Sequence, residues 1–253
     1  MILFLQVLFS AVAWIGISLW TVFWTSLMAV VYLVHPLADP QRRILHRMAS
    51  IWGRGLLGCV VGYRVELSGL EHIPPMRPVI FMANHQSYMD VPALFSLPGQ
   101  LRWMADEGLF RIPVFGWAMR MAGYVPVHRG DAREGIRSLD RAKRLLEQGL
   151  SIFIFPEGTR SHSGLFGRFQ TGGFRLAVAT GTPIVPVVVV GTRQLLPRGT
   201  VIFRWRVRVR ICILAPITPS RDRKSTRALA GQVSAQMKKG YLESLKTARI
   251  TFT

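Results

Sequence analysis

A histidine and an aspartate lie five positions apart in a polar stretch, Asn84-His85-Gln86-Ser87-Tyr88-Met89-Asp90. An imidazole can remove a proton from a hydroxyl near neutral pH, and a carboxylate beside it fixes which ring nitrogen carries hydrogen. A strand would hold His85 and Asp90 about 16 Å apart, and a helix would turn them about 140° from each other. The two side chains therefore meet only if the residues between them form a turn.

A second polar cluster, Pro156-Glu157-Gly158-Thr159-Arg160-Ser161, has residue types that could bind an anion. Glycine permits close approach of the backbone, hydroxyl groups donate hydrogen bonds, and the planar guanidinium of arginine matches a phosphate group. The same residue types also make ordinary turns. Taken alone, this cluster fits an anion site and a plain turn equally well.

Each polar cluster follows an apolar run that is typical of a buried strand. Residues 77–83 precede the first cluster, and residues 151–155 precede the second. In α/β folds, the groups that perform chemistry gather where the strands end. We therefore expect both clusters at the edge of a sheet.

Strand-like and helix-like segments alternate from residue 63 onward. The expected strands are residues 63–68, 77–83, 101–105, 124–127, 151–155 and 184–190, with a strand pair over residues 200–214. The expected helices are residues 115–122, residues 172–180, and a helix that opens with a capping box at Asp131 and Glu134 and ends at Gly149. This alternation predicts an α/β fold with a largely parallel central sheet flanked by helices.

The first 34 residues contain no charged side chain and are rich in large apolar residues. This composition predicts a membrane-embedded helical segment, and neither the basic leader nor the cleavage site of a signal peptide is evident. A helix of this length would reach about 51 Å, well beyond a hydrocarbon core of about 30 Å. The segment is therefore either one long tilted span or two shorter helices that break near Gly16 and dip into one leaflet.

An amphipathic helix is expected over residues 41–59, with arginines largely off its apolar side at positions 42, 43, 47 and 54. Such a helix either lies at the lipid headgroups or packs on the domain. Its arginines predict that this end of the segment faces the cytoplasm. We divide the chain into residues 1–60, a membrane-embedded helix or helical hairpin plus an interfacial helix, and residues 61–253, an α/β domain with a C-terminal amphipathic helix.

The chain carries 32 lysines and arginines against 13 aspartates and glutamates, a net charge of +19, and 50% of its residues are hydrophobic. A nucleic-acid-binding protein would share the charge but seldom the hydropathy. The combination favours an anionic membrane surface, anionic substrates or both as partners, and no nucleic acid. The two cysteines and six histidines show no metal-ligand spacing, so no metal site is expected.

Two later segments each have two interpretations. Arginines at positions 204, 206, 208 and 210 alternate with apolar residues, so one face of a strand is basic. This face is either the solvated side of an edge strand or a contact for phosphate or lipid. Apolar residues spaced four apart over residues 229–245 predict a helix that docks on the domain or, as the second choice, lies on a membrane surface.

The motifs are similar to those of the glycerolipid acyltransferases. Residues 84–90 resemble the first motif of that family, residues 123–129 the second, residues 155–161 the third and residues 184–187 the fourth, in the same order. The resemblance covers residues 60–215, and the nearest branch is the bacterial 1-acylglycerol-3-phosphate acyltransferases. It implies a glycerolipid acyltransferase-like fold and an enzyme of phospholipid biosynthesis.

The resemblance also implies roles for single residues. His85 would take a proton from the free hydroxyl of a lysophospholipid while that oxygen attacks a thioester, and Asp90 would hold the imidazole. The residues expected near the substrate phosphate are Arg129, Glu157, Gly158, Thr159 and Arg160, supported by Asn84 and Ser87. Glu157 cannot itself attract a phosphate, so we expect it to orient a donor or a substrate hydroxyl. No cofactor is expected, because acyl-CoA or acyl carrier protein is the acyl-donor substrate.

The expected reaction makes phosphatidic acid from lysophosphatidic acid on the cytoplasmic side of a bacterial inner membrane. Relatives often have lysines where this chain has Asp106-Glu107 and Gln170, so a lyso-aminolipid or another lysolipid is the alternative acceptor. Two other classes of function share these residues. One is a non-catalytic protein that binds anionic lipids, and the other is a hydrolase in which the same base activates water.

Overall fold

The computed structural model describes residues 2–34, 39–60, 63–128, 130–205, 207–220, 222 and 225–249. The strands within these residues are β1 (Tyr63–Ser68), β2 (Ile80–Ala83), β3 (Leu101–Asp106), β4 (Val125–Val127), β5 (Ser151–Ile154), β6 (Ile184–Val190) and β7 (Val207–Ile213). The helices are α1 (Ile2–Val34), α2 (Arg43–Gly58), α3 (Asp90–Leu94), α4 (Glu107–Arg111), α5 (Phe115–Met121), α6 (Ala132–Glu147), α7 (Gly172–Thr180), α8 (Thr192–Leu195) and α9 (Thr226–Arg249), with a 3₁₀ turn, η1 (Leu70–His72).

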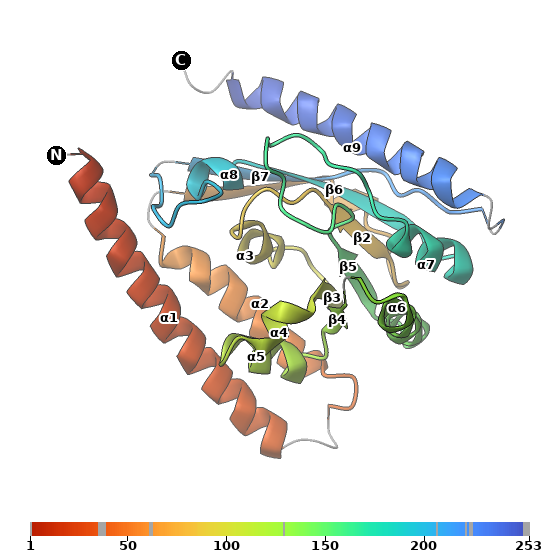
Figure 1. Ribbon diagram of the computed structural model, residues 1–253, viewed down its shortest axis with the longest axis horizontal. Helices are drawn as coiled ribbons and strands as arrows, with labels where there is room; N and C mark the ends of the chain where they lie inside the picture. Colours follow the sequence, from red (N-terminus) through yellow and green to blue (C-terminus); the bar gives the residue numbers. More distant parts are fainter. Residues whose placement is uncertain are drawn as a thin grey trace.

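The strands form one sheet in the order β1-β7-β6-β2-β5-β3-β4 (Figure 1). Within the described residues, neighbouring strands are parallel except for β6 and β7. Parallel neighbours need crossover connections, which helices commonly supply. The predicted α/β fold with a largely parallel central sheet flanked by helices is confirmed.

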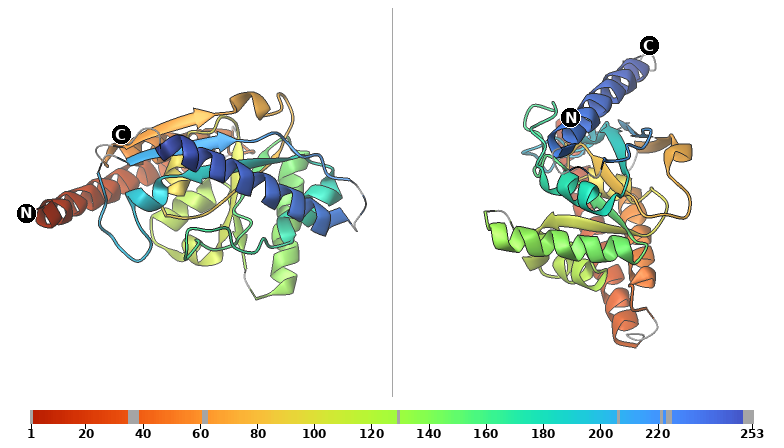
Figure 2. Two further views of the ribbon diagram at one scale, coloured as in Figure 1. Left: turned by 90° about the horizontal axis from the view of Figure 1, so that it is seen from above. Right: turned by 90° about the vertical axis from the view of Figure 1, so that its right-hand side faces the viewer.

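Helices cover both faces of the sheet (Figure 1 and Figure 2). The helices α1 to α5 share a hydrophobic core with one face, and α6, α7 and α9 share a second core with the other. Every residue of β6 is buried; Val185 and Val187 lie in the first core, whereas Ile184 and Val188 lie in the second. This arrangement follows from the alternation of side chains along a strand that has a layer on each face.

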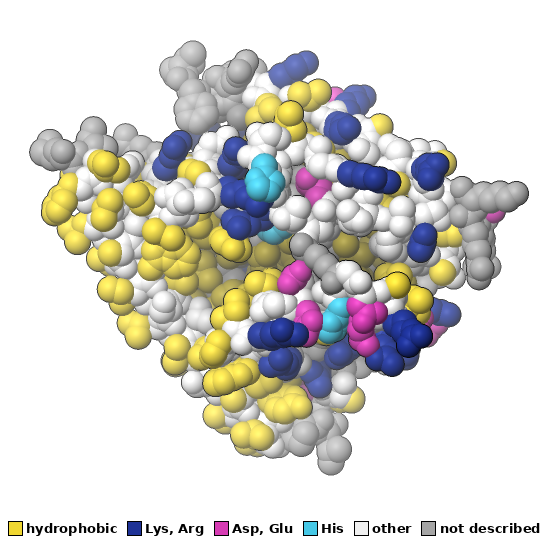
Figure 3. Space-filling model, in the orientation of Figure 1, with side chains coloured by type: hydrophobic (Ala, Val, Ile, Leu, Met, Phe, Trp, Pro, Cys, Tyr) yellow, Lys and Arg dark blue, Asp and Glu magenta, His cyan; other side chains and the backbone are white. Residues whose placement is uncertain are grey.

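The N-terminal segment is one continuous helix, α1, with no break near Gly16. It runs along one side of the molecule (Figure 1) and is long and apolar enough to cross a membrane. One side of α1 packs on α2 and α5. On its other side Phe4, Val12 and Leu19 are each at least 61% exposed. Figure 3 shows the hydrophobic surface that these and similar side chains form along the helix.

Close packing joins α1 to α2. Gly55 has no side chain at the place where Trp20 lies, and a β-carbon there would come within 2.3 Å of the Trp20 ring. The indole N–H of Trp20 donates to the carbonyl O of Trp52 (3.0 Å), and the indole N–H of Trp52 donates to Oγ1 of Thr21 (3.1 Å). Much of the apolar side of α2 is buried. Of the two expectations for this helix, the burial agrees with the one in which it packs on the domain.

The strand pair predicted over residues 200–214 is wrong, because β7 is the one strand among the described residues of this range. Before this strand, the carbonyl O of Val201 accepts from the indole N–H of Trp14 (2.7 Å), and the N–H of Phe203 donates to Oγ of Ser10 (2.9 Å). These backbone groups bind α1 and so cannot continue a ladder with another strand. In addition, β7 lies between β1 and β6 and is not an edge strand.

The basic face of β7 has mixed surroundings. Nε of Arg210 donates to Oε2 of Glu66 on β1 (2.9 Å). Arg208 is exposed and lies opposite Arg64 of β1 in the ladder, and Arg206 lies outside the described residues. Arg210 is therefore paired with a carboxylate, whereas Arg208 lies beside a side chain of the same charge.

The C-terminal helix α9 docks on the sheet, which confirms the first of its two interpretations. Leu229, Val233 and Met237 are buried in the second core. The hydroxyl of Tyr241 accepts a hydrogen bond from Nε2 of Gln86 (2.9 Å), so α9 also supports the loop that follows β2.

A buried histidine joins α2 to β3. His46 is 1% exposed, its Nε2 accepts from the N–H of Leu101 (3.1 Å), and its Nδ1 lies 3.1 Å from the hydroxyl of Tyr124. Burial, and to a smaller extent the positive charge of Arg102, lower the pKa of His46 to about 3. The imidazole is therefore neutral in the folded protein at any pH at which the protein would be handled.

His46 should make the protein less stable in mild acid. The unfolded chain binds a proton at this residue below pH 6.5 or so, whereas the folded chain does not, so the free energy of unfolding falls as the pH drops through that value. At pH 5 the expected loss is about 2 kcal/mol. Thermal unfolding in detergent, compared for wild type and His46→Gln from pH 8 to pH 5, should show a difference in Tm that narrows as the pH falls. A difference that stays constant would contradict this role of His46.

Candidate active site

The residues between His85 and Asp90 form a turn. β2 ends at Ala83, α3 begins at Asp90, and the N–H of Asp90 donates to the carbonyl O of Ser87 (3.2 Å). This turn brings Nδ1 of His85 to 2.7 Å from Oδ2 of Asp90. The structure thus has the geometry that the spacing of the two residues required.

The carboxylate of Asp90 is fully buried and receives several hydrogen bonds. Oδ2 also accepts from the backbone N–H groups of Gln86 (2.6 Å) and Ser87 (2.9 Å), and Oδ1 accepts from the hydroxyl of Thr192. Such donors stabilise a carboxylate in its charged form. Because Nδ1–H of His85 donates to this carboxylate, Nε2 is the ring nitrogen that is able to accept a proton.

The ring of His85 is held from a second side. It stacks on Phe155, the residue after β5, with ring centres 4.0 Å apart and an angle of 15° between the planes. The carbonyl O of His85 accepts from the N–H of Ser161 (2.7 Å). The second polar cluster therefore lies directly against the first.

Asn84 and Ser87 hold the loop to neighbouring elements. The side-chain amide of Asn84 makes two hydrogen bonds of 2.8 Å with the backbone of Val189, so it continues the pairing of β2 with β6. The hydroxyl of Ser87 donates to the carbonyl O of Leu196 (2.8 Å). Both side chains are buried, and both limit the positions that His85 can adopt.

Glu157 connects the two polar clusters. Its Oε1 accepts from the N–H of His85 (3.2 Å) and its Oε2 from the N–H of Gly167 (2.7 Å). Burial raises the pKa of this carboxyl, and the two hydrogen bonds act in the opposite direction. Gly158 follows with φ of 72°, a backbone conformation that strains residues with a side chain.

The cationic group of the second cluster is the guanidinium of Arg160. It lies 3.6 Å from the centre of the Tyr88 ring, and the carbonyl O of Arg160 accepts from the side chain of Arg198. Thr159 is exposed and lines the same cavity as Arg160. Arg129, the other arginine predicted for this site, lies outside the described residues.

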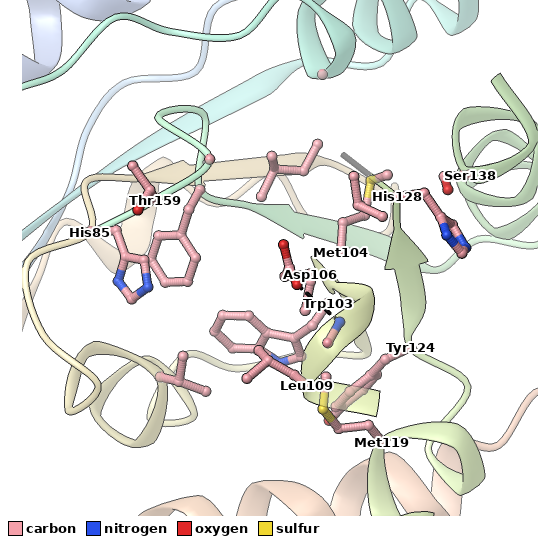
Figure 4. Close-up of a pocket in the computed structure, with 18 of the residues that line it drawn as sticks. His85, Trp103, Met104, Asp106, Leu109, Met119, Tyr124, His128, Ser138 and Thr159 are labelled. Carbon is pink, nitrogen blue, oxygen red and sulfur yellow. Dashed lines mark hydrogen bonds between the residues drawn. The ribbon is translucent and has the colours of Figure 1, made fainter. Parts of the chain in front are cut away.

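His85 opens into a cavity of about 1140 Å³ that is also lined by Thr159 and Arg160. Figure 4 shows His85 and Thr159 close to each other on one side of this cavity and Met119 and Tyr124 on the other. Much of the wall is apolar, with Trp24 and Met28 from α1, Trp52 from α2, Phe95 at the end of α3 and Trp103 from β3. One cavity therefore combines polar side chains that can contact a charged headgroup with apolar side chains that can contact a long acyl chain.

Sequence analysis missed three contributors to this site: Thr192, Phe155 as a stacking partner, and Tyr88 beneath Arg160. Thr192 had a usable signal, because it follows Gly191 directly after the apolar strand β6, just as the other polar clusters follow their strands. The contacts of Tyr88 with Arg160 and of Phe155 with His85 had no such signal, since each depends on how two loops approach each other. Among the described residues, no three His, Cys, Asp or Glu side chains gather as metal ligands.

Comparison with known proteins gives consistent matches. The acyltransferase family model matches residues 64–190. A chloroplastic 1-acyl-sn-glycerol-3-phosphate acyltransferase of Arabidopsis thaliana is 37% identical over 202 residues, 78% of this chain. A 1-acyl-sn-glycerol-3-phosphate acyltransferase of Pseudomonas aeruginosa is 33% identical over 139 residues, 54% of this chain. The chain spans 56% of the length of the first protein and 52% of the second.

A solved structure also matches. The crystal structure of the 1-acyl-sn-glycerophosphate acyltransferase PlsC from Thermotoga maritima is similar to this one with a TM-score of 0.81 and 27% sequence identity. The match covers 96% of this chain and 98% of that one, and so includes α1 as well as the sheet.

Proposed function

The chain belongs to the acyltransferase family, and from that premise we propose that it is a membrane-bound 1-acylglycerol-3-phosphate O-acyltransferase. The observation that carries the proposal is the buried His85–Asp90 pair, whose free Nε2 faces a cavity with a nearby arginine. The names of the relatives supply the acceptor, lysophosphatidic acid, and the product is phosphatidic acid.

In the proposed reaction Nε2 of His85 takes the proton of the acceptor hydroxyl as its oxygen attacks the thioester carbonyl. Asp90 keeps the other ring nitrogen protonated and stabilises the imidazolium that forms. The C–S bond then breaks, and the proton passes from His85 to the departing thiolate. No acyl-enzyme is needed, because the acceptor oxygen attacks the donor directly. The donor is acyl-CoA or acyl carrier protein, both of which present an acyl thioester.

The phosphate of the acceptor is assigned to the second polar cluster. Arg160 supplies the positive charge, and Thr159 supplies a hydroxyl donor beside it. The N–H of Gly158 donates to the carbonyl O of Phe155 (3.0 Å), so the part of this glycine is to let the phosphate approach the backbone closely. Arg129 is assigned to the same group on the basis of its motif. Glu157 has the orienting role, because its carboxylate already accepts two backbone N–H groups and a phosphate would be repelled by it.

One observation favours a different acceptor. Asp106 lines the cavity, at a place where a lysine would attract a phosphate. Its Oδ1 accepts from the N–H of Gly108 at the start of α4, so part of its hydrogen-bonding capacity is used within the chain. A lyso-aminolipid, whose amine would be attracted by this carboxylate, is therefore the second candidate acceptor.

The membrane attachment is assigned to α1. Its exposed apolar side needs a nonaqueous environment, while its other side packs on α2 and α5 and lines the cavity. This arrangement favours a helix that lies in one leaflet, with the cavity beside the lipid from which the acceptor would enter. With the arginines that follow α1, it supports a site on the cytoplasmic side of a bacterial inner membrane.

The catalytic assignment predicts the behaviour of two variants. Wild-type protein given lysophosphatidic acid and an acyl thioester should release thiol, and His85→Ala should lower the rate roughly 100-fold or more, since it removes the general base. Asp90→Asn should lower kcat much more than it changes KM. Thiol release is measured with a colorimetric reagent, and the lipid extract is examined for the acylated product.

His162→Ala is the matched control, because His162 is exposed and does not line the cavity. It should keep the wild-type rate, and thermal unfolding should show that all variants are folded. Undiminished thiol release in His85→Ala would rule out the catalytic assignment. Free fatty acid in place of acylated lipid would show that the protein is a hydrolase. Faster turnover with a lyso-aminolipid than with lysophosphatidic acid would show that the lyso-aminolipid is the acceptor.

Thr192 is expected to act through Asp90. Thr192→Val keeps the shape of the side chain but removes the hydroxyl that donates to Oδ1 of Asp90. Loss of a hydrogen bond to a charged group of this kind should lower kcat by roughly tenfold to a hundredfold and leave KM nearly unchanged. Thr192→Ser keeps the hydroxyl and should stay close to wild type. Equal losses in the two variants would show that only the packing of Thr192 matters.

The assignment of α1 to the membrane predicts an effect of charge on its exposed side. Leu8 and Leu19 are 54% and 67% exposed, and aspartate at both positions should release the protein from neutral vesicles in a flotation experiment. Placing one aspartate within the hydrocarbon costs about 3 kcal/mol. The same change at Leu165 and Leu242, which are 70% and 59% exposed elsewhere on the surface, is the control and should have no effect. Vesicle binding that survives the substitutions in α1 would refute this attachment.

A further inference from the structure

A second cavity, of about 560 Å³, lies where the end of α1, the start of α2, α5 and α6 meet. Its lining includes the arginines Arg42, Arg120 and Arg141 and the aromatic residues Tyr32 and Trp117. It shares the side chains of Tyr124 and His128 with the larger cavity, so it lies next to that cavity and on the side away from His85 (Figure 4).

The positive charge of this second cavity is not balanced by the carboxylates around it. Glu107 lines the cavity, but its oxygens lie 2.6 Å from Arg111 and 2.6 Å from His128. The carboxylate of Asp39 accepts from backbone N–H groups at the start of α2. No ion pair within the described part of the chain involves the cavity's three arginines.

The arginines also repel one another. The pKa of Arg141 is lowered by its partial burial and, in addition, by the positive charges of Arg42 and Arg144. An anion bound among these side chains would relieve the repulsion, and the planar fork of arginine suits a phosphate. The geometry and the charge together favour a phosphate group as the ligand.

Part of this second cavity is already held in place. Nη1 of Arg42 donates to the carbonyl O of Arg120 and, at 3.4 Å, to that of Met121, at the C-terminal end of α5. The same guanidinium lies 5.6 Å from the centre of the Tyr32 ring. Arg42 is thereby fixed, whereas the side chains of Arg120 and Arg141 remain exposed and accessible to a ligand.

The surroundings of the second cavity indicate where the phosphate comes from. Leu33 and Val34, at the end of α1, are 75% and 65% exposed, and Trp117 is 55% exposed. Figure 3 shows basic side chains beside hydrophobic ones over α4 and α5, near this end of α1. Tryptophan and tyrosine prefer the headgroup level of a membrane, and basic residues there attract anionic lipids.

We infer that the second cavity binds the headgroup phosphate of an anionic membrane phospholipid that is not the acyl acceptor. The phosphate lies among Arg42, Arg120 and Arg141, and the acyl chains lie along the apolar surface of α1. This inference rests on the membrane location in the proposed function but not on the acyl transfer. Bound lipid would fix the end of α1 relative to α5 and α6, which together border the larger cavity.

The test compares two double variants that lose the same charge. Arg120→Gln/Arg141→Gln removes two arginines of the second cavity, and Arg64→Gln/Arg208→Gln removes two exposed arginines of β1 and β7 that line neither cavity. Flotation is measured with vesicles of phosphatidylcholine alone and with vesicles that also contain phosphatidylglycerol. Wild type should bind the anionic vesicles more tightly. The first variant should lose roughly tenfold or more of that affinity, and the second should lose clearly less.

Three results would overturn the inference. Equal losses in the two variants would show a general effect of surface charge. Unchanged binding in Arg120→Gln/Arg141→Gln would show that the second cavity holds no lipid. A rise in Tm of the wild type, but not of this variant, with inorganic phosphate in detergent and none with phosphatidylglycerol would assign the cavity to a soluble phosphate. Thiol release is measured separately, so failure of the proposed enzymatic function would leave the vesicle result intact.

Discussion

The buried carboxylate of Asp90 is the group on which the arrangement of the site depends. A charged group without contact to water must be surrounded by donors, and here they come from His85, from the backbone of the turn and from Thr192 after β6. These donors directly follow two neighbouring strands of the sheet, β2 and β6. The orientation of His85 is therefore a property of the sheet and of its loops, and not of residues 84–90 alone.

The position of the cavity links this chemistry to lipid. Residues of α1 form part of the wall of the cavity into which His85 opens, while the opposite side of α1 presents apolar side chains outward. One helix thus separates the proposed reaction site from the proposed membrane surface. A lysolipid can keep its chain in apolar surroundings while its hydroxyl approaches His85, which avoids the cost of moving that chain through water.

The sequence predicted the main features of the fold because they depend on local patterns. Strands β1, β6 and helix α7 have the predicted ends, since runs of apolar residues bounded by turn residues define them. Residues 200–205 were misassigned because the alternation of arginine with apolar residues imitates a strand, whereas backbone groups of Val201 and Phe203 bind α1, nearly two hundred residues away. No local pattern contains a partner at that distance.

For the site, the sequence alone determined which residues were candidates and that His85 and Asp90 could meet only across a turn. The spacing restricts the backbone, and apolar strands before each polar cluster place both at the end of a sheet. Only the tertiary structure decided that Thr192 donates to Asp90, that Glu157 binds backbone N–H groups of two loops, and that arginines from three separate elements line a second cavity. These contacts join segments that are far apart in the chain, and they exist only because the sheet brings those segments together.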